Sequence, residues 1–265
     1  KSNTHGSVFD TITRETFKYL KIVVPTYDDQ IAIASMLSSL DDKIEINNKI
    51  NKTLEEMAQA IFKNWFVDFE PFKDGEFVES ELGMIPKGWL IKGLDEIAQF
   101  LNGLAMQKFR PESKEYLPVI KIRELNLGFS DSKSDKARSN IEEKYKVNNG
   151  DVIFSWSGTL MLKIWTGGEG ALNQHLFKVS SENYPMSFFF MWLNHHIEFF
   201  KAIAADKATT MGHINRKHLS EARVLVPDIS TIERFDKLVG PILQKLIILS
   251  MQNNTLISLR DSLLP

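Results

Sequence analysis

Two segments near the ends of the chain carry the apolar spacing of long amphipathic helices. From Ile33 to Trp65, apolar residues and two asparagines recur at alternating intervals of four and three, the spacing of inward-facing positions in a coiled-coil helix. A second segment, Phe235 to Leu263, repeats this spacing. Each helix would be about 40 to 50 Å long at 1.5 Å per residue, so we expect the two to act as spacers that pack on each other; the pattern leaves their relative direction open. The predicted seam positions are Leu37, Leu40, Ile44, Asn47, Asn51, Leu54 and Ile61 in the first helix and Val239, Ile242, Leu246, Leu249, Asn253, Leu256 and Leu263 in the second.

The two ends of the chain are copies of one unit, because they match without a gap at an offset of 202 residues, as from Pro25 to Pro227. Each copy predicts a capped helical turn, an alternating apolar strand ended by proline, and the long helix. Thr13 and Asn215 are the expected N-caps of the two turns. Asn51 coincides with Asn253, and an asparagine in an apolar seam penalises wrong registers, which suits a spacer. The alternative is an ordinary amphipathic stripe whose asparagines face solvent.

Between the copies, residues 88–227 carry a mixed pattern. We expect a short helix over 94–103, strands within 116–125, 150–158 and 176–181, and a buried helix over 185–205. This predicts an α+β protein, in which a mixed α/β domain with a curved, mostly β core joins the two long helices. Long polar loops are expected over 128–149 and 158–174, and such loops on a rigid scaffold are where recognition residues concentrate.

Charge is unevenly distributed along this chain of 265 residues, 43% hydrophobic and 25% charged, which is in the ordinary globular range. The net charge is −2, an unexpected value for a DNA-binding protein. Residues 26–87 hold 6 basic and 13 acidic side chains, whereas residues 88–227 hold 18 basic and 15 acidic ones. The slightly basic middle domain is therefore the candidate for nucleic acid, and we expect a partner to supply further phosphate contacts.

The loops of the middle domain combine the side chains that read a DNA duplex. Arginine and lysine suit guanine edges or phosphates, amides suit adenine, and hydroxyls suit phosphate oxygens. For any single residue a structural role is an open alternative: Lys121 and Arg123 could form the solvent face of a strand, and Trp156 could belong to the core. The candidate DNA contacts are Lys108, Arg110, Lys121, Arg123, Ser155, Ser157, Lys163, Asn173, Gln174, His175, Thr209, Thr210, His213, Asn215 and Arg216.

Motifs of catalysis are missing from the sequence. There is no cysteine and only six scattered histidines, so we expect no metal site. No two prolines adjoin, as a base-flipping methyltransferase motif would need, and no phosphate-binding G-x-x-x-x-G-K-[ST] motif occurs. We therefore expect no catalytic residues and no cofactor. Two alternatives stay open: a DNA-modifying enzyme with unfamiliar motifs, and a coiled-coil scaffold whose middle domain binds protein.

The lengths of the apolar stretches indicate whether the chain could cross a membrane. The longest, such as residues 186–193, are far shorter than the ~20 residues that cross a bilayer. We expect no membrane association and, from the absence of cysteine, a reducing cytoplasm. The first residues lack an initiator methionine and an apolar signal segment, so we treat the chain as a possible piece of a longer protein.

The order of these features resembles the specificity subunits of type I restriction-modification enzymes. The resemblance rests on the strand, proline and helix unit KIVVPTYDDQIAIASMLSSLDDKIEINNKINKTLEEMAQAIF, on IPKGW, on NNGDVIFSWSG and on ALNQHLFKV. It covers essentially the whole chain, although each motif is loose. It implies a non-catalytic subunit with two target-recognition domains, each reading one half of a bipartite DNA site, held apart by two antiparallel helices.

The resemblance also implies a domain layout and partners. Residues 1–25 would end a first recognition domain, 26–72 would form the central helix, 81–227 a complete recognition domain, and 228–265 the distal helix. Two methyltransferase subunits would dock on the helices and carry out methylation, with restriction subunits attached indirectly. The sequence departs from the family by lacking most of the first domain, so the chain would be a fragment or a half-subunit that dimerises.

Overall fold

The computed structural model describes residues 14–206 and 213–264, and the chain divides into two compact units, residues 1–42 and 43–265. The first unit holds α1 (Arg14–Lys18) and the beginning of α2 (Tyr27–Phe66). Residues 20–26 between them form neither helix nor strand. The strand expected before Pro25 was therefore wrong: within the described residues no neighbouring strand pairs with it, and backbone N–H and C=O groups need such a partner to form a ladder. Thr13 lies outside the described residues.

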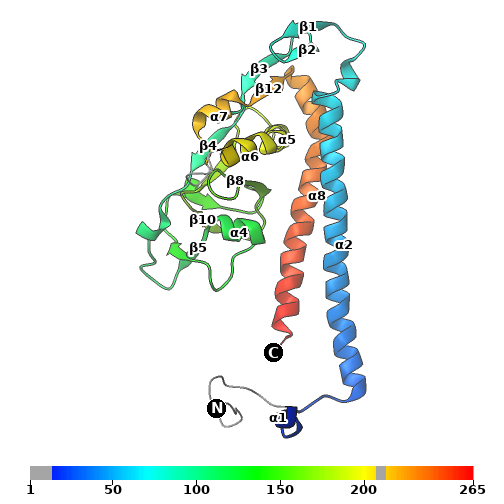
Figure 1. The fold of residues 1–265 in the computed structure, drawn as a ribbon, viewed down its shortest axis with the longest axis vertical. Helices are drawn as coiled ribbons and strands as arrows, with labels where there is room; N and C mark the ends of the chain where they lie inside the picture. Colours follow the sequence, from blue (N-terminus) through cyan, green and yellow to red (C-terminus); the bar gives the residue numbers. More distant parts are fainter. Residues whose placement is uncertain (1–13, 207–212, 265) are drawn as a thin grey trace. The chain divides into compact units, whose positions relative to one another are not determined.

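In the second unit, residues 43–66 of α2 run antiparallel to α8 (Ile229–Ser262), and the two helices lie side by side in Figure 1. The direction follows from two contacts: Asn47 Nδ2 donates to Asn253 Oδ1 at 2.8 Å, and the rings of Phe66 and Phe235 lie 4.8 Å apart. Early residues of one helix thus meet late residues of the other. The prediction of an α+β protein with two long helices is confirmed.

Most of the predicted seam positions are buried or half-buried. Of the positions in the second unit, Asn47, Val239, Leu246, Leu249 and Asn253 are buried, and Ile44, Asn51, Leu54, Ile61, Ile242 and Leu256 are half-buried. Leu263 is the exception, because it is the exposed C-cap of α8. Leu37 and Leu40 lie in the first unit and are half-buried.

Residues 77–226, which include nearly all of the middle domain predicted over 88–227, form short strands in two four-stranded sheets and two pairs. The sheet orders are β4-β11-β8-β9, which is antiparallel throughout, and β6-β5-β10-β7, in which only β5 and β10 are parallel. The hairpin β1-β2 stands apart, and β12 pairs with β3. The strands are β1 (Phe77–Ser80), β2 (Gly83–Pro86), β3 (Leu90–Gly93), β4 (Gln99–Asn102), β5 (Tyr116–Ile120), β6 (Lys136–Arg138), β7 (Lys146–Val147), β8 (Val152–Ser155), β9 (Met161–Ile164), β10 (Gly170–Leu172), β11 (Leu176–Ser180) and β12 (Arg223–Val226).

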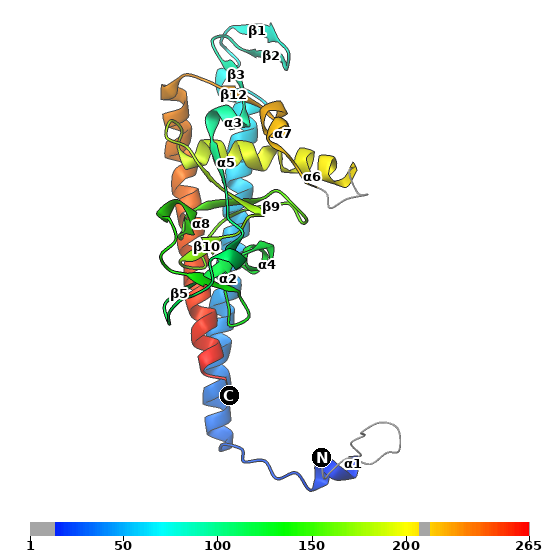
Figure 2. The same ribbon diagram turned by 90° about the vertical axis from the view of Figure 1, so that its left-hand side faces the viewer.

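The helices of the middle domain are short and cover the strands. In Figures 1 and 2 the domain lies along the helix pair, with the β1-β2 hairpin at one end and β5 and α4 toward the other. The helices are α3 (Leu94–Ile97), α4 (Ile122–Leu127), α5 (Met186–His195), α6 (Ile197–Asp206) and α7 (Arg216–Glu221), with 3-10 turns at η1 (Glu70–Phe72), η2 (Met106–Lys108) and η3 (Glu143–Tyr145).

Four expectations for this domain need correction. The helix expected over 94–103 is α3 followed by strand β4, and the strand expected over 116–125 ends at Ile120, where α4 takes over. The helix over 185–205 is two helices that meet at His196. The two expected loops contain β6 and β7, and β9 and β10. In each case pairing with distant residues overrode the local pattern, since short segments have no strong preference of their own.

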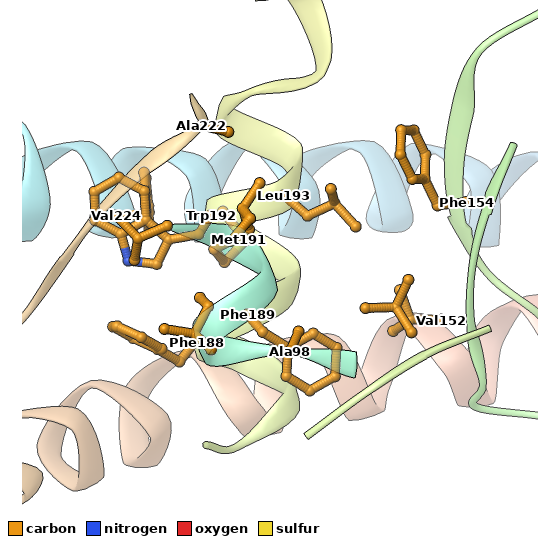
Figure 3. Packing of buried hydrophobic residues seen from close by; sticks show 14 of the residues in the cluster. Ala98, Val152, Phe154, Phe188, Phe189, Met191, Trp192, Leu193, Ala222 and Val224 are labelled. Atoms are coloured by element: carbon orange, nitrogen blue, oxygen red, sulfur yellow. The ribbon is translucent and has the colours of Figure 1, made fainter. Parts of the chain in front are cut away.

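The main core joins the domain to the helix pair. Phe188, Phe189 and Trp192 of α5 are buried in this core (Figure 3). The same cluster includes Phe62 of α2 and Phe235 of α8, and the ring of Phe62 lies 5.0 Å from that of Trp192. Ser187 of α5 also donates to Asp236 Oδ1 of α8 at 2.6 Å. Because α8 packs on both α2 and α5, it buries a second row of side chains that the coiled-coil spacing did not predict: Ile232, Leu243 and Ile247.

Candidate functional site

Side chains from three separate segments of the middle domain meet in one open pocket of about 370 Å³, here called the loop pocket. One side chain comes from η2, three residues surround the start of α4, and three occupy the turn between β10 and β11. Five of the seven are predicted DNA contacts. The pocket is lined by Gln107, Lys121, Ile122, Arg123, Asn173, Gln174 and His175.

The turn at 173–175 is held in place by a close backbone approach. Gly103, directly after β4, packs so closely that a Cβ there would lie 2.2 Å from the carbonyl oxygen of Asn173. Only glycine fits such an approach. Asn173 is buried and its backbone N–H donates to Ile120 O at 3.2 Å, so the turn is fixed. Within it Gln174 is half-buried and His175 is exposed.

A buried carboxylate organises the start of α4. Glu124, only 2% exposed, accepts hydrogen bonds from the backbone N–H of Lys121 (3.2 Å), from Ser134 Oγ (2.9 Å) and from Arg123 Nη1 (2.8 Å). The first of these bonds is the reciprocal cap of an N3 glutamate on its own helix. Glu124 thus ties Lys121, Arg123 and the loop around Ser134 together.

Both cations of the loop pocket have carboxylate partners. Lys121 Nζ bonds to Asp135 Oδ2, and Arg123 donates to both oxygens of Asp131, at 3.1 and 2.5 Å. Hydrogen bonds from Arg123 lower the pKa of Asp131 to about 2, and the same carboxylate, with Glu124, raises the pKa of the Arg123 guanidinium. Both side chains stay partly exposed, so they are oriented and still accessible.

Trp156 lies beside the loop pocket, next to His175. Its indole N–H donates to Asn102 Oδ1 at 2.9 Å, and its half-buried ring lies 5.9 Å from the ring of His175 and 6.4 Å from that of His213. An isolated backbone bridge pairs Ser157 with His213. Ser155 is buried and donates to Thr159 O at 2.8 Å, which assigns it to the structure of this turn.

The remaining predicted contacts lie around the loop pocket or away from it. Lys108 and Arg110 are exposed beside Gln107, and Arg216 is exposed in the first turn of α7. Asn215 is the N-cap of α7, as its sequence position predicts, and its side chain accepts from His218 N. Thr209 and Thr210 lie outside the described residues.

Lys163 occupies a different place from the other cations. It lines a groove of about 570 Å³ between the middle domain and the helix pair, and its Nζ donates to Asn126 O at 2.8 Å. Glu55 of α2 lines the same groove. Burial lowers the pKa of Lys163 and raises that of Glu55, so both side chains are partly withdrawn from solvent in this groove.

Three residues of the site escaped the sequence analysis. Gln107 lies in the segment that supplied Lys108 and Arg110, and its amide is the type of group that suits a base edge. Glu124 stands three residues after Lys121, the spacing of a capping glutamate. Gly103 is the last residue of the helix expected over 94–103. The close approach that requires glycine there depends on a residue 70 positions away and leaves no local signal.

The loop pocket can recognise a polar planar edge. It offers three amides, two cations paired with carboxylates and an imidazole, which are hydrogen-bond donors and acceptors rather than a nucleophile with its base. Within residues 14–206 and 213–264, no three histidine or carboxylate side chains gather as they would around a metal ion. Among the same residues, every helix is too short or too polar to span a membrane.

Comparison with known proteins gives consistent matches. Residues 1–56 and 86–259 match the family described as Type I restriction modification DNA specificity domain. The chain is 31% identical over 275 residues to the MjaIX specificity subunit of Methanocaldococcus jannaschii, covering all of this chain and 63% of that protein. It is 25% identical to the HindI specificity subunit of Haemophilus influenzae, covering 72% of that protein. The chain thus spans about two thirds of the length of these relatives.

A solved structure resembles this fold. The S subunit of a type I restriction-modification system from M. genitalium superposes with a TM-score of 0.58 at 15% identity, covering 99% of this chain and 67% of that one. At this identity the likeness concerns the fold alone.

Proposed function

Because this chain belongs to the family of type I restriction-modification specificity domains, we propose that its middle domain reads one half of a bipartite DNA site. The observation that carries the proposal is the loop pocket, where segments around residues 107, 121–123 and 173–175 converge. Amide and guanidinium groups are the side chains that distinguish bases in the major groove. A fixed scaffold with projecting polar side chains is what base reading requires.

The proposed role of the helix pair is that of a spacer and scaffold. The antiparallel helices α2 and α8 hold the middle domain through α5 and the groove that contains Lys163 and Glu55. A rigid support of this kind suits a site whose two halves lie a set distance apart. The helices would also carry methyltransferase subunits, which supply catalysis and the phosphate contacts that a chain of net charge −2 lacks. We place the assembly in the cytoplasm, with its DNA.

The test is a domain exchange. Residues 88–227 are replaced with the corresponding segment of a family member of known target, the chain is assembled with its methyltransferase partner, and modified adenines are mapped across a genome. We expect one half of the modified site to change to that of the donor while the spacing between the halves is kept. An unchanged site would refute the proposal.

Binding assays on the chain and on its complex with the methyltransferase distinguish a DNA-modifying enzyme from a protein-binding scaffold. Binding of S-adenosylmethionine by the isolated chain would favour a modifying enzyme. Failure of the assembled complex to bind any DNA, with the methyltransferase still attached, would favour a protein-binding scaffold.

A further inference from the structure

We propose that Arg123 reads a guanine in the half-site, through the edge of its guanidinium formed by Nε and Nη2. This inference rests on the proposed function and adds a base and a reading group to it. The argument uses the partners of Arg123, the charge around it and the geometry of base edges.

Three of the five guanidinium N–H groups are already used. Nη1 donates to Glu124 Oε1 and to Asp131 Oδ1, and Nη2 donates to Asp131 Oδ2. A guanidinium carries five N–H groups in a planar fork, so the Nε–H and one Nη2–H are left. These two point in parallel from one edge of the group. Within the described part of the chain neither has a protein acceptor, and the side chain is 44% exposed and lines the loop pocket.

Two parallel donors match guanine and no other base. In the major groove guanine presents two acceptors, O6 and N7, whereas adenine presents the acceptor N7 beside the N6 donor. Against adenine, one of the two Arg123 donors would face another donor. Thymine and cytosine each offer at most one acceptor, so the free edge of Arg123 selects guanine.

The surroundings argue against a phosphate contact. Glu124, Asp131 and Asp135 are bonded to Lys121 and Arg123, so three negative charges face two positive ones. Lys133, whose charge also acts on Asp131, adds a third positive charge, so the cluster has no net charge. Phosphate binding draws its strength from uncompensated cations that release counterions. A neutral cluster gains little from a phosphate but can bind the uncharged edge of a base.

Glu124 and Asp131 are positioning residues for this edge. Glu124 is buried and fixed by Ser134 and by its own helix, and Asp131 is fixed by the backbone N–H of Lys133 at 2.9 Å. Arg123 is thereby held in one orientation before DNA arrives. A side chain held in this way loses little freedom on binding.

The experiment compares three variants of the chain assembled with its methyltransferase subunits. Arg123→Gln removes both the charge and the planar guanidinium, whereas Arg123→Lys keeps only the charge. Asp131→Asn keeps Arg123 but weakens the hydrogen bonds that fix its orientation. Arg223→Gln is the matched control, because Arg223 is equally exposed and pairs with a single carboxylate, that of Glu81, away from the loop pocket. The readout is the base frequency at each position of the modified site.

We expect Arg123→Gln and Arg123→Lys to make one guanine of the half-site degenerate. The preference for guanine should fall roughly 5- to 150-fold, the value of one bidentate contact. Asp131→Asn should relax the same position to a smaller extent, and Arg223→Gln should leave every position unchanged. The slope of log affinity against log salt should be unaltered in Arg123→Lys and should change by much less than 1 in Arg123→Gln, whereas loss of a phosphate contact lowers it by about 0.9.

The possible outcomes distinguish the role of Arg123 from the proposed function of the middle domain. A site without guanine in the half read by this domain, or unchanged specificity in both Arg123 variants, overturns the role of Arg123 while a successful domain exchange still supports the proposed function. A uniform loss of affinity with a reduced salt slope assigns Arg123 to a phosphate and overturns guanine reading. An unchanged site after domain exchange refutes the proposed function itself.

Discussion

The two copies of the repeated unit have similar sequences and different environments. In the second copy, α7 leads into β12, whose Val224 and Val226 are buried. In the first copy, α1 leads into residues that form no strand, and the corresponding Ile22 is 79% exposed. The difference lies in pairing: β12 is hydrogen-bonded to β3, with Val224 opposite Lys92, and the described residues supply no equivalent for the first copy. An alternating apolar pattern therefore specifies which side chains a strand would bury, while the strand itself depends on a neighbour.

The helices of the two copies differ in where asparagine occupies the seam. Asn47 in α2 corresponds to Leu249 in α8, whereas Asn51 corresponds to Asn253. In the antiparallel pair Asn47 bonds to Asn253, and Asn51 Nδ2 donates to Ser250 Oγ at 3.1 Å. The two asparagines that align in the sequence therefore do not meet. Antiparallel packing pairs different positions of the copies, so the repeat alone could not identify the partners.

The largest expected effect tests the role of the strand partner. Val224→Asp should destabilise the chain by about 4 kcal/mol or more, because it buries an unpaired charge beneath β12. Ile22→Asp, at the equivalent exposed position, should change the free energy of unfolding by no more than about 0.5 kcal/mol. Urea denaturation followed by circular dichroism measures both. Equal losses in the two variants would mean that the first copy is buried as well.

The next effect concerns the seam of the helix pair. Leu54→Asp or Leu256→Asp should cost several kcal/mol, since each places a charge between α2 and α8. The neighbouring exposed positions Thr53 and Thr255 provide matched controls, whose replacement with aspartate should be nearly neutral. The midpoint of thermal unfolding is the measurement. Unaltered melting of both leucine variants would show that the helices do not stabilise each other.

A smaller effect is expected from the buried asparagines. Asn47→Leu should cost roughly 1 to 3 kcal/mol, because it leaves the Asn253 carbonyl oxygen buried without its donor. Replacing Asn253 with leucine as well should restore much of that loss, since removing both partners of a buried polar pair is often nearly neutral. A double-mutant cycle in urea measures the coupling. Additive losses would show that the two amides act independently.

The smallest effect compares the caps of the two long helices. Thr26 and Asp228 follow the two equivalent prolines, and each accepts from a backbone N–H three residues on, at 3.3 and 3.0 Å. Replacement of either with alanine should cost about 1 kcal/mol of helix stability. Amide hydrogen exchange in the first turn of α2 and α8 measures the loss, and protection unchanged in both turns would exclude a capping role.

The two caps should differ in their response to pH. Hydrogen bonds from Ser230 and Thr231 lower the pKa of Asp228 to about 2. A lowered folded-state pKa stabilises the protein above the ordinary aspartate pKa, near 4, and this contribution is lost as pH falls from there toward 2. Asp228→Asn should remove that dependence while keeping a cap. The hydroxyl of Thr26 does not titrate in this range, so a Thr26→Ser variant should keep the acid response of the native chain.

Much of the architecture could be inferred from local pattern. The two long helices, the proline boundaries and the cap at Asn215 depend on residues within a few positions of one another, and they were predicted. The strands at Val152–Ser155 and Leu176–Ser180 also follow from short apolar segments bounded by turn residues. The elements that were misjudged, such as β4 and α4, are four to six residues long, too short for periodicity to distinguish helix from strand.

The candidate site divides in the same way. The residue types of a base reader were visible in the sequence, including five that line the loop pocket. The sequence did not show that these residues converge, that Glu124 accepts a hydrogen bond from Arg123, or that residue 103 must be glycine. The convergence and the glycine depend on contacts between segments far apart in the chain.

By itself, then, the sequence determined a repeated spacer, a mixed domain between its copies and the kinds of side chain that domain presents, since these follow from periodicity and composition. Tertiary structure alone decided which strand found a partner, which asparagines met across the antiparallel helices and which cations share a pocket. The physical reason is that hydrogen-bond ladders, buried amides and ion pairs are formed between residues whose distance along the chain has no bearing on their distance in space.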